Sequence, residues 1–457
     1  MPRLDDPWVR VTAGFSQAWI LVFTHLNAIL GLGYKQEWPA HTAGPPRLKE
    51  GPLPSIRHCA AVLAGLLVAA PLAIGCADAQ PAATTPPTVK IGVLTDMGSS
   101  YSDYGGAGSV LAARMAIADS GMADRVQLVS SDTQNKADVG AGIAHAWFSA
   151  DVDAIFDVPN SSVALSVNGE AGRSRKLVFF STTINDRITE QECNGYGIAW
   201  VWDTYSVGRS EALSLLKAGK DTWFVITPDG AAGAALEQTA RQAAQDNGGR
   251  VLGSLHHAIG ETDWASFLLQ ARASGAKAVL FGSGGADLVN GLKQAREFGL
   301  PQSGMTLATM YMVITDVDAL GLEAVGGLNA VTAFYWDRDD ASRGFARRFF
   351  EQRRKMPTMF QAGVYSAVTQ YLKAVQATGS KAADTVRDHL RKTPMEDMFL
   401  RHGKLLANGR MLNDILLVRI KTPAESKRPW DYFQITGVVP GEDAFRKLSA
   451  SACPLVK

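Results

Sequence analysis

Short apolar runs alternate with segments of helical periodicity from Val89 onward. Each run is rich in Val, Ile, Leu and Phe and has the length of a strand, and apolar residues recur at helical spacing between several of the runs. Strands that helices cover on both faces are apolar along their whole length, so the pattern predicts a parallel α/β fold. The predicted strands are 89–95, 126–132, 154–158, 177–182, 222–229, 278–283 and 327–336.

The series of strands restarts near Asp221. Two runs of about four strands each are separated by the segment 190–206, which does not repeat the strand and helix unit. We therefore expect two doubly wound lobes with a cleft between them. In such folds the ligand binds beyond the carboxyl ends of the strands.

A glycine-rich stretch, IGVLTDMGSSYSDYGGAGSVLAARMA (91–116), follows the first predicted strand. A dinucleotide fingerprint would place its glycines directly at the turn from strand to helix. Here Gly106 and Gly108 come late, Leu111 occupies the position of the third glycine, and no lysine follows as a P-loop requires. The simpler interpretation is that the glycines let a helix start against a turn. We expect no nucleotide and no other cofactor.

The composition indicates a globular protein whose net charge is close to zero. The chain has 457 residues, of which 46% are hydrophobic and 19% charged, enough for two or more lobes. Lys and Arg number 45 against 44 Asp and Glu, which leaves a formal charge of +1. A basic surface for nucleic acid is therefore not expected.

The segment before the first strand predicts export. Basic residues precede the apolar run Cys59–Gly75, and Ala77-Asp78-Ala79 follows it, which is the order of a signal peptide with cleavage after Ala79. The run is short for a membrane span and contains Pro71, so a permanent transmembrane helix is the weaker interpretation. Residues 73–76 also form an imperfect lipobox, which leaves lipid attachment at Cys76 as an alternative. Either route predicts a periplasmic protein.

The residues before this signal are unusual. We assign 56–79 to the signal peptide and 80–87 to a Pro/Thr-rich spacer, and 1–55 to a leader of doubtful origin. Signal peptides normally begin near the translation start, so our hypothesis is that the start has been placed too early. A long amphipathic leader is the alternative.

Two cysteines, Cys193 and Cys453, lie beyond both the cleavage site and the lipobox. In an oxidising compartment they suggest one disulfide, with two separate thiols as the alternative. No C-x-x-C pair occurs, and His256 and His257 lack spaced partners, so we expect no metal site.

Small polar residues follow two of the predicted strands. Asn160, Ser161 and Ser162 come after 154–158, and Ser181, Thr182 and Thr183 come after Phe180. Asn160 or Ser161 can cap the following helix while free amides face an anion. Two hydroxyl-rich strand ends on one edge predict a carboxylate cradle, although each residue taken singly fits an ordinary cap or turn.

Catalysis is the competing class of function. No G-x-S-x-G elbow is complete, since Gly282-Ser283-Gly284 lacks part of the pattern, and no H-E-x-x-H occurs. Asp203, Asp229 and Asp287 follow strand or hinge segments, but no histidine or second acid is placed beside them by the sequence. Alternatively, these aspartates cap helices or lie at the solvated edges of loops. We therefore expect that the protein is not an enzyme.

Several segments, taken in order, resemble a known family, the type I periplasmic substrate-binding proteins of the leucine/isoleucine/valine-binding kind, which serve ABC transporters. VKIGVLTDMGSSYSDYGGAGSVLAARMAIAD is similar to the first strand, loop and helix of that family, which implies that the glycine-rich loop lines a solute cleft. The similarity runs from about Val89 to the C-terminus. MPTMFQAGVYSAV and PAESKRPWDYFQI resemble a proteobacterial subgroup associated with aromatic-acid uptake. Further similar segments are PNSSVALSV, FFSTTINDRIT, WDTYSVGRSEA, FVITPDGAAGAALE, TDWASFLLQARASGAKAV and GGADLVNGLKQAREFGL.

The resemblance implies roles for the candidate residues. Residues 160–162 and 181–183 would hold the ligand's carboxylate in lobe 1, and Tyr205 with the loops at Asp229 and Asp287 would close from lobe 2. Many relatives have an aromatic residue where this chain has Gly230-Ala231-Ala232, a change expected to widen the pocket. Candidates for apolar walls, or alternatively for core positions, are Trp202, Tyr205, Tyr335 and Trp336.

The resemblance also implies the organisation and the partners. Lobe 1 would hold 88–203 and 332–400 and lobe 2 would hold 204–331 and 401–457, joined by a three-crossing hinge. The expected function is capture of a small carboxylate, an amino acid or an aromatic acid, and delivery of this ligand to an ABC permease in the inner membrane. The protein itself is expected to be a monomer. A periplasmic sensor for a signalling partner and a secreted hydrolase are the alternatives.

Overall fold

The computed structural model describes residues 87–456. The expected signal peptide, the leader before it and Cys76 lie outside the described residues. No helix in the described part of the chain is long and apolar enough to cross a membrane.

The first sheet is parallel and has the order β2-β1-β3-β4-β5. Its central strands are buried along their whole length, as expected for strands that helices cover on both faces. We call the body built on this sheet lobe 1. The strands are β1 (Val89–Thr95), β2 (Val126–Asp132), β3 (Ala154–Asp157), β4 (Leu177–Phe180) and β5 (Gly197–Ala199).

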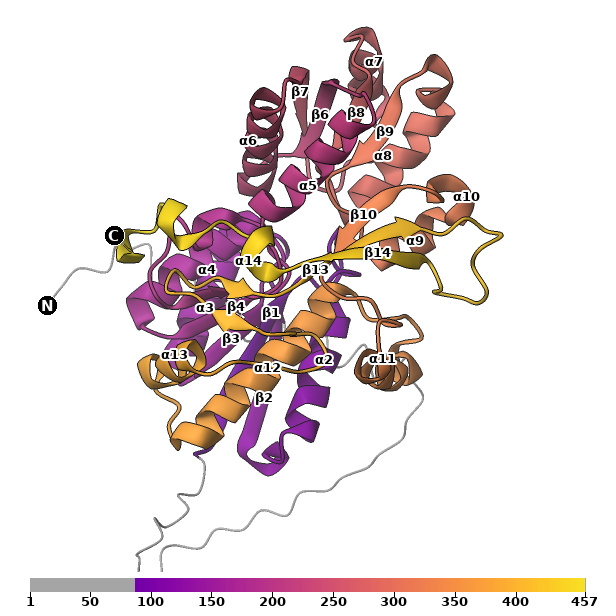
Figure 1. Ribbon diagram of the computed structural model, residues 1–457. Coiled ribbons are helices and arrows are strands. Elements are labelled where there is room, and N and C mark those ends of the chain that lie inside the picture. The colour runs from indigo at the N-terminus through magenta and orange to yellow at the C-terminus, as the bar shows by residue number, and fades with distance from the viewer. Residues whose placement is uncertain (1–86, 457) are drawn as a thin grey trace, which may run out of the picture. The chain divides into compact units, whose positions relative to one another are not determined.

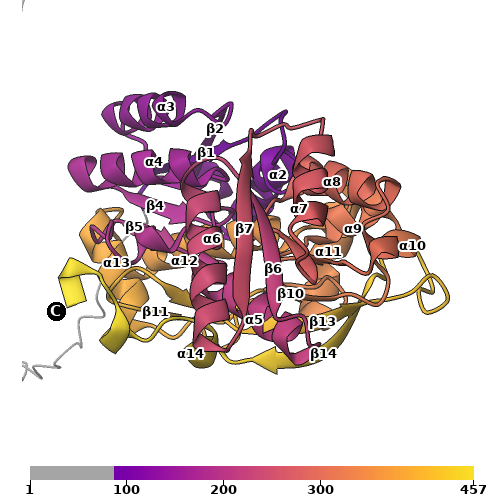
Figure 2. The ribbon, with the colours of Figure 1, turned by 90° about the horizontal axis from the view of Figure 1, so that it is seen from above.

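Helices cover both faces of this sheet. Two pairs of helices pack together, α2 with α12 and α3 with α4. Figure 2 shows α3 and α4 on one side of the sheet and α12 on the other. The helices are α2 (Gly106–Asp119), α3 (Ala137–Ser149), α4 (Ser161–Ser174), α11 (Asp340–Arg353), α12 (Met359–Thr378) and α13 (Ala383–Lys392).

The second sheet is also parallel, with the order β7-β6-β8-β9, and we call the body built on it lobe 2. The predicted fold class, two doubly wound parallel lobes, is thus confirmed, and lobe 2 lies above lobe 1 in Figure 1. The strands are β6 (Thr222–Pro228), β7 (Arg250–His257), β8 (Ala278–Phe281) and β9 (Thr306–Thr309). The helices are α5 (Thr204–Lys217), α6 (Ala231–Asp246), α7 (Ala265–Ala273), α8 (Gly285–Glu297), α9 (Ile314–Leu320) and α10 (Leu322–Val325).

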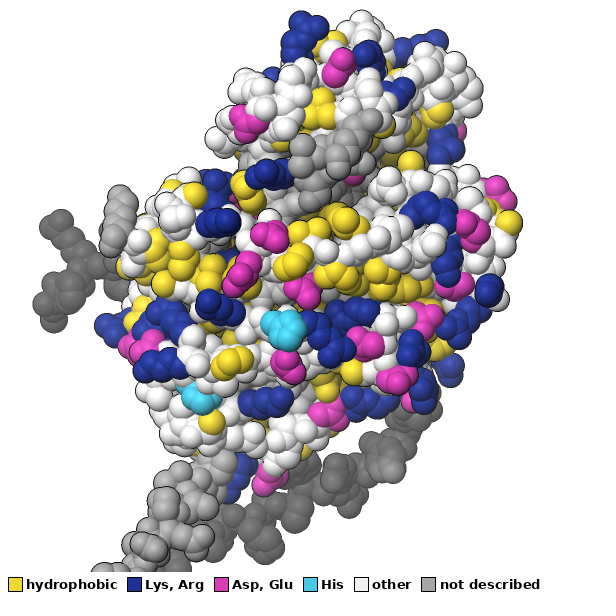
Figure 3. Space-filling model, viewed as in Figure 1, with side chains coloured by type: hydrophobic (Ala, Val, Ile, Leu, Met, Phe, Trp, Pro, Cys, Tyr) yellow, Lys and Arg dark blue, Asp and Glu magenta, His cyan; other side chains and the backbone are white. Residues whose placement is uncertain are grey.

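A third sheet is antiparallel, with the order β10-β13-β14. The predicted strand 327–336 forms here, over the shorter span of β10 (Asn329–Thr332), so it is not part of either parallel sheet. The other two strands of the sheet, β13 (Ile415–Ile420), which pairs with β10, and β14 (Phe433–Val439), which pairs with β13, were not predicted. Figure 3 shows hydrophobic side chains gathered over this sheet, among interspersed charges of both signs, and Val438 of β14 is 54% exposed.

Three connections link the two lobes and the third sheet. The chain leaves β5 for α5 through 200–203, returns from β10 to α11 through 333–339, and leaves β12 (Met411–Leu412) for β13 through 413–414. The segment after Arg401 contacts both lobe 1 and the third sheet. Its hairpin of β11 (Lys404–Leu405) and β12 lies beside β5 through a bridge between Ala199 and Arg410, whereas β13 pairs with β10. The lobe boundaries drawn from the sequence stay a prediction.

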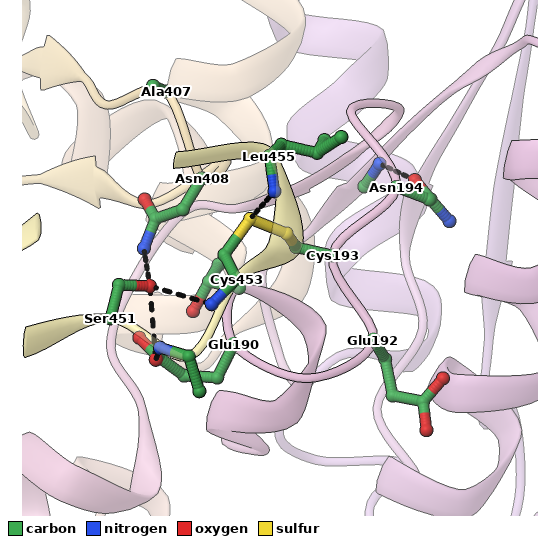
Figure 4. The surroundings of a disulfide bond; sticks show 12 residues. Glu190, Glu192, Cys193, Asn194, Ala407, Asn408, Ser451, Cys453 and Leu455 are labelled. Carbon is green, nitrogen blue, oxygen red and sulfur yellow. Dashed lines mark hydrogen bonds between the residues drawn. A yellow bond between two sulfur atoms is a disulfide. The ribbon is translucent and has the colours of Figure 1, made fainter. Parts of the chain in front are cut away.

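A disulfide joins Cys193 to Cys453, the pair expected from the sequence (Figure 4). The carboxylate of Glu190 accepts hydrogen bonds from the Ala452 amide (2.6 Å) and the Ser451 hydroxyl (3.1 Å) beside it. The C-terminal tail, which includes α14 (Gly441–Ala444), is therefore fixed to lobe 1 close to β5. A cross-link that closes a loop of 260 residues restricts the unfolded chain strongly.

Candidate functional site

A cavity lies between the carboxyl ends of the strands of the two lobes. Its volume is about 30 Å³, which is room for one or two water molecules. Both lobes contribute to its wall, as the predicted position of the cleft requires. The lining residues are Tyr101, Tyr104, Pro159, Asn160, Ser161, Ser162, Thr182, Ile184, Pro228, Asp229, Ala231, Ala232, Ile259, Tyr311 and Phe360.

The lobe 1 side of the cavity is built at the end of β3. Asp157 and Val158 have positive φ values of 89° and 61°, which non-glycine residues seldom adopt and which a β-branched valine adopts least readily. This turn brings Asn160 to the start of α4, where its side-chain oxygen accepts hydrogen bonds from the amides of Ser162 (2.9 Å) and Val163 (3.1 Å). Asn160 is therefore the N-cap of α4.

The cap changes what α4 offers to an anion. Two amides of the first turn are already bonded to Asn160, and the Ser161 amide, which comes first in the helix, forms no backbone hydrogen bond. The Ser161 hydroxyl lies 3.0 Å from the Thr183 hydroxyl. Lobe 1 thus presents one amide, hydroxyls and the positive end of a helix dipole rather than a ring of free amides.

The second predicted hydroxyl cluster is divided by the structure. The Thr182 hydroxyl lines the cavity and donates to the carboxylate of Asp157. Burial raises the pKa of Asp157, against the lowering effect of the hydrogen bonds from Thr182 and its neighbours. Thr183 reaches the cavity wall through Ser161, whereas Ser181 is fully buried and does not line the cavity.

The lobe 2 side of the cavity is the N-terminus of α6. Gly230 precedes this helix with a φ of 104° and no side chain caps it. The Ala231 amide lies 3.3 Å from the Ser162 hydroxyl of lobe 1, and the amides of Ala232 and Gly233 form no backbone hydrogen bond. Two helix N-termini, one from each lobe, therefore face the same small space.

Gly230, Ala231 and Ala232 lie where the two lobes meet beside the cavity, and the widening expected from them stays a prediction. A Cβ at Gly230 would lie 3.0 Å from the Ser162 hydroxyl, so the small residues let the two lobes approach closely here. Asp229, the preceding residue, is exposed at the rim of the cavity, and its amide donates to the carbonyl of His257.

Four aromatic residues form the apolar walls, and none of them was predicted from the sequence as a wall residue. Tyr101 and Tyr104 come from the glycine-rich loop, Tyr311 follows β9, and Phe360 is in the first turn of α12. The carboxylate of Asp96 shapes the loop by accepting hydrogen bonds from backbone amides, among them that of Tyr101 (2.9 Å). The loop therefore lines the cavity, as the resemblance implied.

Trp202 supports this wall from behind. Its ring packs edge-on against Tyr311 (5.7 Å between ring centroids) and against Phe360 (5.4 Å). Trp202 lies in the connection 200–203 between the lobes, and its carbonyl accepts a hydrogen bond from Arg410 (3.1 Å). This hinge segment and the cavity wall are therefore in direct contact.

Three other candidates lie away from the cavity. The Tyr205 ring packs against the guanidinium group of Arg446 at 4.5 Å, in a groove beside α5 and α6. Tyr335 packs on Phe433, and the Trp336 indole donates to the Trp430 carbonyl (2.8 Å), so both belong to the core beside the third sheet.

The side chain of Asp287, in lobe 2, contacts lobe 1 but does not line the cavity. Its carboxylate accepts hydrogen bonds from the Gly260 amide (3.0 Å) and from the Ser100 hydroxyl of lobe 1 (3.3 Å). Burial raises the pKa of this carboxyl. A second interlobe contact joins the Asn185 side chain to the Ala231 carbonyl (3.1 Å). The lobes are thus in contact around the cavity, and this is a closed arrangement.

The incomplete G-x-S-x-G segment forms a pair of buried side chains. The Ser283 hydroxyl lies 2.7 Å from Nε2 of His257, and Nδ1 of the same ring lies 2.8 Å from the Ala258 carbonyl. Nδ1 therefore donates to the Ala258 carbonyl, and Nε2 faces the Ser283 hydroxyl. A backbone carbonyl stands where a triad has its carboxylate, and Ser283 is fully buried.

No group of three or more His, Cys, Asp and Glu side chains within residues 87–456 is arranged to hold a metal ion.

Comparison with known proteins identifies the family. Residues 88–427 match a family described as periplasmic binding protein. A search of curated proteins finds no match. A periplasmic binding protein from Burkholderia mallei is 39% identical, with a TM-score of 0.78, over 81% of this chain and 99% of its own.

Two further solved structures extend the comparison. A branched chain amino acid ABC transporter periplasmic ligand-binding protein from Burkholderia xenovorans is 43% identical, with a TM-score of 0.71, over 81% of this chain and 100% of its own. An ABC transporter solute binding protein from R. palustris, solved with benzoate, shares the fold at 17% identity and a TM-score of 0.70, over 80% of this chain and 100% of its own. The chain therefore belongs to the type I periplasmic binding proteins, the solute-binding proteins of ABC transporters.

Proposed function

We propose that this protein captures a small organic carboxylate between its lobes and delivers it to an ABC permease. The observation that carries the proposal is the convergence of two helix N-termini, those of α4 and α6, on one cavity that also contains the hydroxyls of Ser161, Ser162 and Thr182. Helix N-termini with unbonded amides favour negative charge.

The charges around the cavity support a carboxylate rather than a more highly charged anion. No lysine, arginine or histidine is among the lining residues, and Asp229 at the rim is the one acid among them. A single carboxylate can be satisfied by neutral donors alone, whereas a phosphate usually attracts arginine or lysine. An α-ammonium group would need an acidic partner, and Asp229 is placed to supply it when the ligand is an amino acid.

The aromatic walls favour an aromatic acid as the ligand class, with an aliphatic amino acid as the other candidate. Tyr101, Tyr104, Tyr311 and Phe360 offer ring faces and edges to a flat ligand. Structures with the same fold are described as bound to benzoate and to 4-hydroxybenzoate, and a more similar relative is described as the periplasmic ligand-binding protein of a branched chain amino acid ABC transporter. The present cavity has room for one or two water molecules, so entry of a ligand requires the lobes to separate.

The finer parts of the assignment follow from the family. We infer a monomer that works in the periplasm, reached through the signal peptide at 56–79, with a permease of the inner membrane as its partner. Binding without chemical turnover fits the buried Ser283 and His257 pair, which lacks a third member. Sequencing the N-terminus of the secreted protein tests the export route, with Gln80 expected as the first residue.

A thermal-shift screen over amino acids, aromatic acids and the matching amides tests the ligand class. A ligand that binds the folded state raises the unfolding temperature, and the matching amide of a true ligand should not, because it lacks the carboxylate. Stabilisation by amides and acids alike would contradict a carboxylate site. Hydrolysis of any ester or amide in the screen would contradict a pure binding protein.

A further inference from the structure

The hydroxyl of Tyr104 joins the two lobes directly. Tyr104 belongs to the loop after β1 in lobe 1, and its hydroxyl lies 2.6 Å from the carboxylate of Asp316, in α9 of lobe 2. The same oxygen accepts a hydrogen bond from the Gly285 amide (2.6 Å), at the start of α8. The hydroxyl therefore donates one hydrogen bond and accepts another in contacts between the lobes, and neither bond goes to a ligand.

The position of Tyr104 is itself fixed within lobe 1. Its carbonyl accepts a hydrogen bond from the Thr358 hydroxyl (2.8 Å), and its ring packs on Phe360 at the wall of the cavity (5.3 Å between ring centroids). The bond to Asp316 thus holds a cavity wall against the opposite lobe.

We infer that Asp316 is a positioning residue for ligand capture, which stabilises the closed arrangement through Tyr104 and makes closure depend on pH. The inference rests on the proposed capture by lobe closure and concerns its regulation. Asp316 is 2% exposed in the closed arrangement, and when the lobes separate it loses Tyr104, the group of lobe 1 that touches it. Water then reaches the carboxylate.

The groups around Asp316 determine the sign of the effect. Burial, with a smaller contribution from the like charge of Asp103, raises the pKa of Asp316 to about 7, against lowering by the bonds from Tyr104 and the Val313 amide. Tyr104 and Tyr311 are the titratable groups beside it, and burial raises the pKa of both well above their usual range. Asp103 is paired with Lys355 (2.8 Å).

The neighbouring helices add no opposite charge. Asp318 of α9 and Glu323 of α10 are exposed, and Asp287 of α8 acts on Tyr311. Within the part of the chain that the structure describes, no lysine, arginine or histidine forms an ion pair with Asp316.

The closed form therefore binds a proton that the open form releases. With a pKa of about 7 when closed and an ordinary aspartate value when open, the ratio of closed to open molecules is highest in acid and falls as the pH rises to about 7. Above that pH the ratio is constant. Between pH 5.5 and pH 8.5 the linkage gives a decrease of up to about 30-fold.

Pulsed electron paramagnetic resonance on the ligand-free mature protein tests the inference. Nitroxide labels on Ser303→Cys of lobe 2 and Lys373→Cys of α12, both exposed positions, report the distance between the lobes, and the native disulfide takes no label. We expect the short-distance population to decrease strongly from pH 5.5 to pH 8.5. In Asp316→Asn, which keeps the acceptor oxygen and cannot titrate, we expect the closed population to stay high at both pH values.

Matched variants separate this effect from general damage. Asp318→Asn changes the same residue type on the same helix, where the partner is the Tyr432 hydroxyl (2.6 Å) outside the cavity, and should keep the wild-type pH response. Tyr104→Phe should reduce the closed population at pH 5.5, with an unchanged circular dichroism spectrum showing that it folds. A wild-type distance distribution that is the same at both pH values, or an Asp316→Asn variant that responds like the wild type, would overturn the inference. Since no ligand is used, either result is independent of the thermal-shift screen.

Discussion

Ser161 offers the sharpest test of the carboxylate cradle. Its hydroxyl lines the cavity at the N-terminus of α4 and has one protein partner, the Thr183 hydroxyl at 3.0 Å. It does not cap the helix, because Asn160 does so. Ser161→Ala therefore removes a proposed donor to the ligand and should leave the cap and the fold of lobe 1 intact.

The expected magnitudes differ for affinity and for stability. Loss of one hydroxyl from a carboxylate site should weaken binding by about 1 to 2 kcal/mol, a roughly tenfold increase in Kd. The free energy of unfolding should change by about 1 kcal/mol or less, since a neutral hydroxyl pair is lost and alanine is a good helix former. Asn160→Ala should behave differently and reduce stability by about 1 kcal/mol, because it removes the cap.

Calorimetry with a ligand from the screen measures the first quantity, and thermal unfolding measures the second. Ser174→Ala is the matched control, a serine-to-alanine change at the opposite end of α4, where the hydroxyl donates to Glu170 (2.8 Å). It should leave Kd unchanged. If Ser161→Ala and Thr182→Ala both fold and both bind as tightly as the wild type, the ligand does not lie at this edge of the sheets.

Three further predictions follow from single contacts. Tyr205→Ala should leave Kd nearly unchanged by calorimetry, because the ring lies against Arg446 outside the cavity, and a tenfold loss would place the ligand elsewhere. Thiol titration of the denatured, unreduced mature protein should find no free thiol, and reduction should lower the free energy of unfolding by about 2 to 4 kcal/mol; two free thiols would contradict the pairing. Arg410→Ala should destabilise the protein by about 3 to 5 kcal/mol in denaturant titrations, since it leaves buried Asp203 without its cation at 3.4 Å, and Asp203→Asn in the same chain should recover part of that loss.

The sequence predicts six strands of the two parallel sheets because they are locally encoded, whereas β5, β7 and β9 were not predicted. Ala154–Asp157 and Leu177–Phe180 are apolar at every position but one, and the shortness of these runs favours a buried strand over a helix. The antiparallel sheet was missed for the opposite reason. β14 is buried at Phe433 and exposed or half-buried at its other positions, and it pairs with β13 across a bulge. β13 in turn pairs with β10, a strand that lies far away in the chain.

The candidate site was partly predictable in the same sense. Asn160 and Ser161 are marked by their place between a strand and a helix, which is a local signal. Tyr311 and Tyr205 carry no such distinction, since Tyr311 is one of several aromatic residues that follow a strand and Tyr205 lies in the first turn of α5. What separates them is that Tyr311 packs on Trp202 across the hinge and Tyr205 packs on Arg446 of the C-terminal tail, two contacts that exist only in the folded chain.

A cradle made of neutral groups from both lobes suits a protein that has to release what it binds. Each hydroxyl and amide contributes little by itself, and the α6 amides and Tyr311 belong to lobe 2 whereas Ser161 and Thr182 belong to lobe 1. In the proposed site, separation of the lobes therefore removes the contacts from one lobe at once, without breaking an ion pair inside either lobe. In the proposed cycle, a permease that pulls the lobes apart needs to oppose the Tyr104 and Asp316 contact and the other interlobe bonds, and the ligand's affinity falls as soon as they are broken.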